Sequence, residues 1–272
     1  MVDGESGDVV RGPESIRVPA GGVPGNPAWS RDGARLAFTL RAPNRTLHRV
    51  MVSEGVGGPV REIARVDLRV MGLAWAADGR FVVVGGRAAT RQLAWIGRIA
   101  VGTGAIERLA TAPVNALAAG VGEEVAYVRA APAGERTVRV TVLPHPGATP
   151  RVIATYVAAE LPRTMSVSPD GKWLALVRAV GGGRASALLL LPVAGGEGRV
   201  LLRLERPDAL ELNVGGLPWT ATGDRVLVAL RFRGRRQLAA VRVDSGAATM
   251  VSFAPQRGGR WQPALRAGGG EM

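Results

Sequence analysis

The stretch PAWSRDGARLAF, residues 27–38, decides the fold of this chain because it recurs. A tryptophan stands four positions before Gly33 of an Asp-Gly pair, and a short apolar segment follows the glycine. Segments of the same form are AWAADG, LAAGVG, SVSPDG and PWTATG, which end at Gly79, Gly122, Gly171 and Gly223. The copies lie 43 to 52 residues apart, and a weaker sixth copy, ALRAGG, ends at Gly269. A period of this length predicts a repeat architecture.

Apolar residues recur in fixed columns around the turn glycine. The position four before it is apolar in all six copies, which have Trp29, Trp75, Ala118, Val167, Trp219 and Leu265. Positions three, four and five after it are also apolar in the first five copies, as in Leu36, Ala37 and Phe38. Apolar residues on both faces predict a strand packed between two other sheets. An Asp-Gly pair between two strands predicts a hairpin with a type I′ turn.

A second glycine column follows the first and completes the repeating unit. Its members lie 23 or 25 residues after the turn glycine, and they are Gly58, Gly104, Gly147, Gly196 and Gly246. Each stands between two apolar segments, as in LLLLPVAGGEGRVLLRL. One unit is therefore a four-stranded antiparallel meander of about 45 residues. Units of this kind stack radially in a β-propeller, so we predict an all-β fold of this type.

The motifs AWSRDGARLAF and SVSPDGKWLAL resemble the Trp-Ser-Pro-Asp-Gly-Lys repeat of TolB-like bacterial propellers, often called WD-repeat-like. The resemblance covers roughly residues 14–267. The third copy keeps only Gly122 of the Asp-Gly pair, and the fifth copy reads ATGD. This broad group includes the periplasmic TolB protein, which binds protein partners, and propeller domains fused to peptidases or kinases. The resemblance thus implies a binding propeller in a periplasmic or extracytoplasmic compartment.

Composition limits the class of protein. The chain has 272 residues, of which 47% are hydrophobic and none is cysteine. It can bury a sizeable core, and disulfides and thiolate metal sites are excluded. The first ten residues, MVDGESGDVV, have neither the basic nor the apolar region of a signal peptide. The longest strongly apolar run, ALLLLPVA, is too short to span a bilayer. As it stands, the sequence predicts a cytoplasmic protein, in conflict with the resemblance.

The formal net charge of +13 has two interpretations. It can indicate binding to nucleic acid or another polyanion. It can also reflect a bias toward arginine over lysine, because Lys172 is the only lysine. We favour the compositional interpretation. The expected loops contain almost no aromatic residues besides Phe232, whereas single-strand binders use aromatic platforms. We therefore expect no specific nucleic-acid binding.

A search for chemistry finds no catalytic constellation. His48 and His145 fall in expected surface strands or turns and lack the spacing of metal ligands. There is no Gly-x-Ser-x-Gly elbow and no phosphate-binding glycine loop. We interpret the aspartates of the Asp-Gly pairs as turn residues rather than metal ligands, and the tryptophans as inter-blade core. The innermost strands offer only neutral polar groups to a central channel: Asn26, Asn115, Ser166, Ser168 and Thr220. We expect a non-enzymatic protein without a cofactor.

One charge pattern is not explained by turns. Arginine brackets the loop between the second and third strands of every unit. The pairs are Arg41 and Arg45, Arg87 and Arg91, Arg129 and Arg136, Arg178 and Arg184, and Arg231 and Arg236. In a meander these loops emerge at one face and the Asp-Gly turns at the other. The loops that join units lie on the arginine face and carry Asp67, Glu160, Glu205, Asp208 and Glu211, which would neutralise part of it.

These arginines are either structural, bonding loop backbone, or form a binding surface. The function that follows from the second interpretation is a non-catalytic scaffold that binds an acidic segment of a protein partner, because the arginine fork holds carboxylates bidentately. The alternative is a regulatory or gating propeller domain of a peptidase- or kinase-associated enzyme, whose catalytic part is not on this chain.

The ends of the chain suggest incomplete closure. We expect a tail over residues 1–13, one propeller domain over residues 14–267, and a second tail over residues 268–272. Five units are complete, but the sixth has only an inner strand at 261–266 and an outer strand near 15–18. We therefore predict a six-bladed plan with an incomplete sixth blade. Exposed strand edges invite pairing with other chains, so we expect dimerisation or aggregation.

Overall fold

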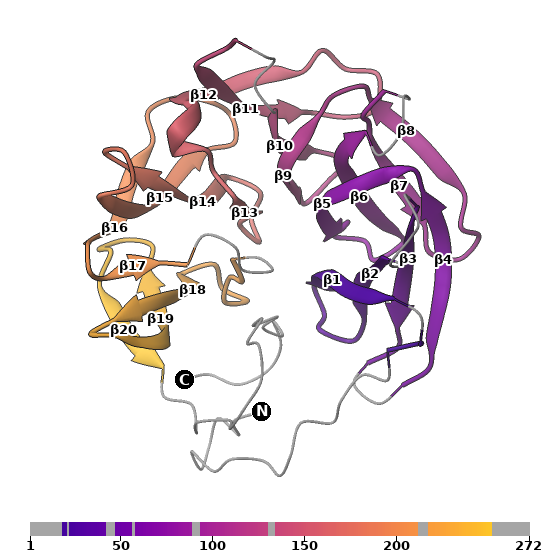
Figure 1. The fold of residues 1–272 in the computed structure, drawn as a ribbon, viewed down its shortest axis with the longest axis horizontal. Helices are drawn as coiled ribbons and strands as arrows, with labels where there is room; N and C mark the ends of the chain where they lie inside the picture. The colour runs from indigo at the N-terminus through magenta and orange to yellow at the C-terminus, as the bar shows by residue number, and fades with distance from the viewer. Residues whose placement is uncertain are drawn as a thin grey trace.

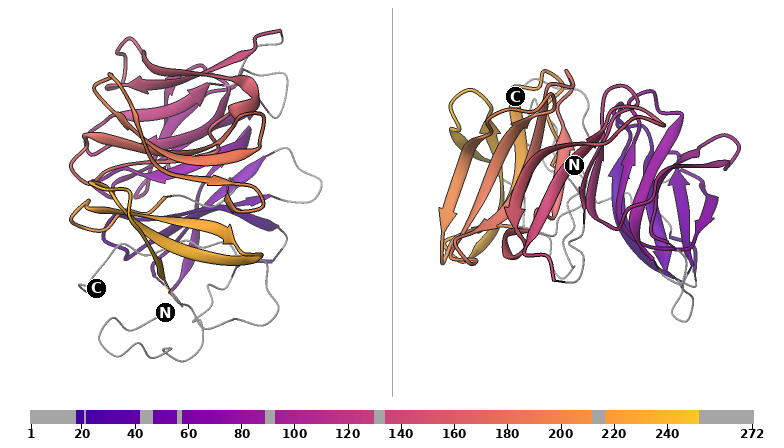
Figure 2. Two further views of the ribbon diagram at one scale, coloured as in Figure 1. Left: turned by 90° about the vertical axis from the view of Figure 1, so that its left-hand side faces the viewer. Right: turned by 90° about the horizontal axis from the view of Figure 1, so that it is seen from above.

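The computed structural model describes residues 18–20, 22–41, 47–55, 58–88, 93–129, 134–211 and 217–251. It is a β-propeller of four-stranded antiparallel sheets, the blades, which follow one another in chain order around a central axis (Figure 1). The strands of each blade run between the two faces of a disc (Figure 2). In the described ranges the only helical element is the short 3₁₀ segment η1, Ala158–Glu160, between the third and fourth blades.

The strands of each blade follow one another from the channel outward in sequence order, so the fourth strand is outermost in all five. The first blade contains β1 (Val23–Trp29), β2 (Leu36–Arg41), β3 (His48–Ser53) and β4 (Val60–Val66). The second contains β5 (Leu68–Trp75), β6 (Phe81–Ala88), β7 (Ile96–Ala100) and β8 (Ile106–Ala110). The third contains β9 (Val114–Ala119), β10 (Val125–Arg129), β11 (Thr137–Leu143) and β12 (Arg151–Val157). The fourth contains β13 (Thr164–Val167), β14 (Trp173–Val180), β15 (Ala185–Pro192) and β16 (Arg199–Glu205). The fifth contains β17 (Ala209–Leu210), β18 (Arg225–Phe232), β19 (Arg235–Arg242) and β20 (Ala248–Val251).

The hydrophobic core lies between consecutive blades. One apolar cluster joins the first blade to the second, another the second to the third, and so on to the fifth. The middle residues of the apolar columns, such as Ala37 and Ala175, are fully buried because each faces a neighbouring blade. Trp75 and Trp219 belong to these clusters. The prediction of tryptophans packed between blades is confirmed for these two, whereas Trp29 is partly buried and packs against residues of the first blade alone.

The Asp-Gly turns are hairpins, but they are not type I′ turns. In the first blade Gly33 N donates to Ser30 O at 2.9 Å, and Ser30 N donates to Arg35 O at 2.8 Å. Gly33 has a positive φ of 66°, whereas Asp32 does not. A type I′ turn needs a positive φ at both central residues. The loop has instead a four-residue hydrogen-bonded turn that ends in a left-handed glycine, so our prediction of the turn type was wrong.

The second glycine column allows close approach between neighbouring blades. Gly104 and Gly246 both have positive φ values, of 74° and 71°. A Cβ added to Gly104 would lie 2.4 Å from the carbonyl oxygen of Ile63 in the preceding blade, and one added to Gly246 would lie 2.2 Å from that of Leu201. At these two positions glycine is required by both the backbone conformation and the neighbouring blade.

The structure shows five blades, and not the six-bladed plan with an incomplete sixth blade that we predicted. Each of the five has all four strands, and no strand of a sixth sheet lies among the described residues. The segments expected to contribute to a sixth blade, residues 261–266 and 15–17, lie outside the described residues. The first and fifth blades stand apart in Figure 1. On the face of the first blade that does not meet the second, Leu36, Phe38, Leu40 and Met51 form a cluster shared with no other described blade.

Candidate functional site

The aspartates of the Asp-Gly turns hold their own loops. Asp32 Oδ1 accepts hydrogen bonds from Ser30 Oγ at 2.6 Å and from Ala34 N at 3.0 Å. Asp170 repeats this pattern with Ser168 Oγ at 2.5 Å and Lys172 N at 3.1 Å. These bonds stabilise the ionised form, so the pKa of each carboxyl lies below its ordinary value. The interpretation of the aspartates as turn residues is supported by this geometry.

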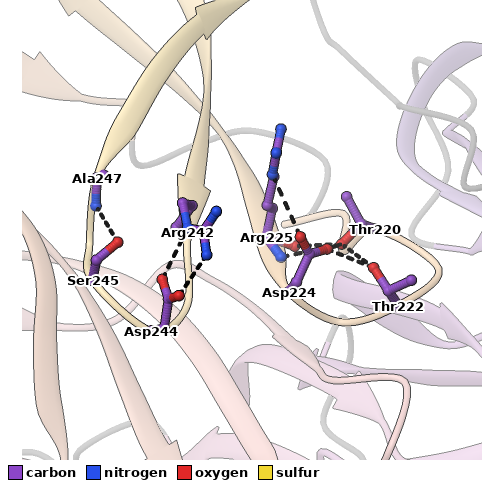
Figure 3. A network of polar contacts seen from close by, with 8 residues as sticks. All are labelled: Thr220, Thr222, Asp224, Arg225, Arg242, Asp244, Ser245 and Ala247. Atoms are coloured by element: carbon purple, nitrogen blue, oxygen red, sulfur yellow. Dashed lines mark hydrogen bonds and ion pairs between the residues drawn. The ribbon is translucent and has the colours of Figure 1, made fainter. Parts of the chain in front are cut away.

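Two turns that lack the aspartate replace it with a carboxylate located after the glycine. In the fifth blade Asp224 accepts hydrogen bonds from the hydroxyls of Thr220 at 2.6 Å and Thr222 at 2.5 Å (Figure 3). In the third blade Gly122 N donates to Glu124 Oε2 at 2.8 Å. Sequence columns miss these residues because Asp224 stands two positions, and Glu124 three positions, beyond the place of the aspartate. We find no cluster of three or more metal-ligating side chains within the described part of the chain.

The opposite face carries the arginines that bracket the loops between second and third strands. The first member of each pair ends, or nearly ends, the second strand of its blade, so the five members occupy equivalent positions around the ring. Two of them bond side chains outside their own strand. Arg87 donates to the Oδ1 atom of Asn115 in the third blade, with Nη2 at 2.5 Å. Arg178 pairs with Glu160 of η1 and lies over the ring of Tyr156.

The remaining bracketing arginines differ in their surroundings. Arg184 Nε donates to Gly181 O within its own loop at 3.0 Å. Arg236 forms an ion pair with Glu211 at 3.3 Å. Arg41, Arg129, Arg136 and Arg231 are exposed and have no side-chain hydrogen bond or ion pair to any residue that the structure describes. Arg45 and Arg91 lie outside the described residues.

The acidic residues of this face are already occupied. Glu160 accepts a hydrogen bond from Gly181 N at 2.8 Å in addition to its pair with Arg178. Asp208 accepts from Arg233 N at 2.7 Å, and Asp67 accepts from Trp95 Nε1 at 2.9 Å. Glu205 pairs with Arg203 and Glu211 with Arg236. Glu160, Glu205 and Glu211 therefore lie in ion pairs, Asp67 and Asp208 accept from neutral N–H groups, and Arg41, Arg129 and Arg231 pair with no carboxylate of the described residues.

A different group of arginines, which the sequence analysis did not single out, connects consecutive blades. Arg151 Nη2 donates to Val193 O of the fourth blade at 2.8 Å. Arg199 Nη1 donates to Asp244 O of the fifth blade at 3.1 Å. Both residues begin the fourth strand of their blade, directly after the second glycine turn. The sequence could have revealed these two arginines, because each follows the second turn glycine of its blade by three or four residues.

The inner strands surround a central cavity of about 430 Å³. Its wall includes Trp29, Trp75 and Trp219, together with small apolar residues of the five blades. Of the five polar residues expected at the channel, Asn26, Ser166, Ser168 and Thr220 line the cavity, whereas Asn115 does not. Asn26 has a positive φ of 50° and its amide donates to Val70 O of the second blade at 3.3 Å. Trp219 Nε1 donates to Ser166 Oγ at 2.8 Å.

The two histidines differ, and one contradicts the sequence analysis. His145 is exposed, as expected, with Nδ1 3.0 Å from Pro146 O. His48, which we had placed on the surface, is only 7% exposed in β3. It is buried because β3 is a central strand with packed residues on both sides. Burial, with Arg41 and Arg69 nearby, lowers the pKa of the His48 imidazole below its ordinary value.

Comparison with solved structures identifies the fold. TolB from Acinetobacter baumannii matches with a TM-score of 0.61 at 14% identity, over 83% of this chain and 53% of that chain. A putative TolB from Agrobacterium tumefaciens matches with a TM-score of 0.62 at 12% identity, over 84% of this chain and 80% of that chain. A chain from a study of two prolyl endopeptidases matches with a TM-score of 0.55 at 13% identity, over 86% of this chain and 37% of that chain.

The chain therefore has a TolB-like β-propeller fold. At these identities the likeness establishes the fold alone, and the neighbours include both TolB proteins and enzymes. This chain spans about half the length of the Acinetobacter TolB chain. No protein-family model and no curated protein matches the sequence. Within the described ranges we find no helix with the length and hydrophobicity needed to cross a bilayer.

Proposed function

We propose that this chain is a non-catalytic, TolB-like propeller that binds an acidic segment of a protein partner across its arginine face. The observation that supports the proposal is the set of exposed arginines at equivalent positions, Arg41, Arg129 and Arg231, which end or nearly end second strands. Arginine is suited to this task because its planar fork matches carboxylates. A rigid ring would present these forks with fixed spacing.

Charge balance on that face favours an acidic partner. Three of the five acids in the joining loops, Glu160, Glu205 and Glu211, are already paired with Arg178, Arg203 and Arg236, so their charges are balanced by other arginines. The net charge of +13 adds a long-range attraction for a negatively charged segment. We also propose a periplasmic location, which the TolB resemblance supports.

A second candidate is a regulatory propeller domain of an enzyme whose catalytic part is not on this chain. It is favoured by the match to the prolyl endopeptidase chain, in which 86% of this chain aligns with only 37% of the other. A thermal-shift screen separates the two candidates. Strong stabilisation by a substrate-like small molecule would favour the domain of an enzyme, because binding to the native state raises the melting temperature.

The arginine-face proposal is tested by charge reversal of residues that have no structural partner. We would replace Arg41, Arg129 and Arg231 with glutamate and measure anisotropy of a fluorescein-labelled decaglutamate peptide. The matched control reverses three exposed cations elsewhere on the disc, Arg61, Arg80 and Lys172, and changes the net charge equally. Arg87, Arg178 and Arg236 are left intact because their replacement would break contacts within the fold.

We expect the arginine-face variant to lose at least tenfold in affinity at moderate salt, while the control changes by less than threefold. Exposed charges act over about one Debye length, so the difference depends on where the charge stands. Equal weakening by both variants would show that only net charge attracts the peptide, and the proposed surface would be wrong.

A further inference from the structure

The mouth of the central cavity at the Asp-Gly face is built from one residue of each blade. These residues stand two positions before the turn glycine and all line the cavity: Arg31, Ala77, Gly120, Pro169 and Ala221. Four of the five are small or compact. Arg31 is the only member with a long side chain and the only one with a charge. The mouth is thus a ring of short residues with a single arginine.

The Arg31 side chain crosses this mouth. Its Nη2 atom donates to the carbonyl oxygen of Pro169 at 2.8 Å. The two residues are 138 positions apart in the sequence and belong to the turns of the first and fourth blades. Their inner strands, β1 and β13, face one another across the centre of the ring (Figure 1). The guanidinium therefore spans the opening and rests on a neutral acceptor.

The cavity has an excess of positive charge. Among the described residues, the charged ones that line it are Arg31, Asp32 and Arg163. The Asp32 carboxylate is bound within its own turn by Ser30 Oγ and Ala34 N. Arg163 precedes β13 at the opposite end of the inner strand, is exposed, and makes no side-chain hydrogen bond or ion pair to a residue in the described ranges. Two guanidinium groups therefore face the cavity without a carboxylate of the protein.

The rest of the wall is neutral and partly apolar. It includes Trp29, Trp75 and Trp219 together with leucine, alanine and methionine side chains. A volume of about 430 Å³ lies within the range of ligand sites that hold small organic molecules. Such a wall suits an uncharged, partly apolar body, while the arginines suit an anionic end.

We propose that the central cavity binds a small organic carboxylate, which enters from the Asp-Gly face and replaces Pro169 O as the hydrogen-bond acceptor of Arg31. A carboxylate offers the Arg31 guanidinium an opposite charge and two parallel N–H···O bonds, whereas Pro169 O is a single neutral acceptor. The ligand's carboxylate is held by Arg31 and its apolar body lies against the tryptophan-bearing wall. This site lies on the opposite face from Arg41, Arg129 and Arg231, so it does not depend on the function proposed above.

The test measures binding of 4-phenylbutyrate and of its amide by isothermal titration calorimetry. A second pair of probes, N-acetyl-trialanine and its C-terminal amide, compares a carboxylate with an amide at the end of a short peptide. The variants are Arg31→Ala and Arg31→Lys, with Arg80→Ala as the control, because Arg80 is an exposed arginine beside the equivalent turn of the second blade and does not line the cavity. Far-UV circular dichroism and the melting temperature establish that each variant is folded.

We expect saturable binding of 4-phenylbutyrate that weakens about tenfold or more in Arg31→Ala, since a bond to a charged group is lost. Arg31→Lys should recover only part of the affinity because it lacks the fork. The amide should bind at least tenfold more weakly than the acid, and Arg80→Ala should bind like the wild type. Equal binding of acid and amide, unchanged binding in Arg31→Ala, or no saturable binding to the wild type would overturn the proposal. Binding of the peptide acid alone would overturn the assignment of a small organic acid.

Discussion

Replacing Gly246 with alanine should destabilise the propeller more than replacing Gly147 does, although both glycines belong to the same column. Their φ values are similar, at 71° and 79°. A Cβ at position 246 would lie 2.2 Å from Leu201 O of the neighbouring blade, whereas a Cβ at position 147 would have no atom within 4 Å. The pair therefore separates the effect of turn conformation from that of contact between blades.

The expected magnitudes follow from these two effects. A left-handed backbone costs a residue other than glycine about 1–2 kcal/mol. Alanine recovers roughly 0.4–1 kcal/mol by restricting the unfolded chain. Gly147→Ala should thus lower the free energy of unfolding by about 1 kcal/mol. In Gly246→Ala the fifth blade must also move away from Leu201, and forced overpacking typically adds about 1–3 kcal/mol. We expect a total loss of about 2–4 kcal/mol.

The assay is urea denaturation followed by both tryptophan fluorescence and far-UV circular dichroism, because coincident transitions justify a single free energy of unfolding. Gly104→Ala serves as a repeat of the experiment between the first and second blades, where the Cβ would lie 2.4 Å from Ile63 O. Equal losses in Gly147→Ala and Gly246→Ala would refute the reasoning, since turn conformation alone would then explain the glycine column.

Four further outcomes follow from the contacts. Arg151→Ala should cost about 1 kcal/mol by removing its bonds to the fourth blade, and Arg136→Ala should cost nothing measurable, as judged by urea denaturation. Asp224→Ala and Asp170→Ala should each lower the free energy of unfolding by about 1 kcal/mol in urea denaturation, because each carboxylate accepts hydrogen bonds within its own turn. The pKa of His48 is lower in the folded than in the unfolded protein, so the unfolded chain takes up the proton first as pH falls. The free energy of unfolding should therefore decrease from about pH 7 downward. His48→Gln should remove that part of the pH dependence. Exposed strand edges should produce a dimer in light scattering at raised concentration, and a monomer at every concentration would contradict that expectation.

Much of the fold could be predicted from the sequence because the deciding signals are local. Each described blade repeats the glycine columns and the apolar triplet, such as Leu36 to Phe38; the glycines lie in turns and the triplets on strands. The number of complete blades also follows from counting these units. The described residues form five blades, and the weak copy near Gly269 that suggested a sixth lies outside them.

The candidate sites were less predictable, because a sequence column does not reveal a partner. Arg87, Arg129 and Arg178 look alike in the sequence, yet one bonds Asn115, one is exposed without a carboxylate, and one pairs with Glu160. The outcome depends on which side chain of the next blade or joining segment lies within reach.

The sequence alone determined the repeating unit, the positions of its turns and the alternation of its buried strands, since these depend on residues only a few positions apart. Only the tertiary structure decided how the blades meet. It placed His48 inside the sheet, brought Gly246 against Leu201, and stretched Arg31 across the mouth to Pro169. These contacts join residues that are far apart in the chain, and they depend on the angle and spacing between blades, which no local pattern encodes.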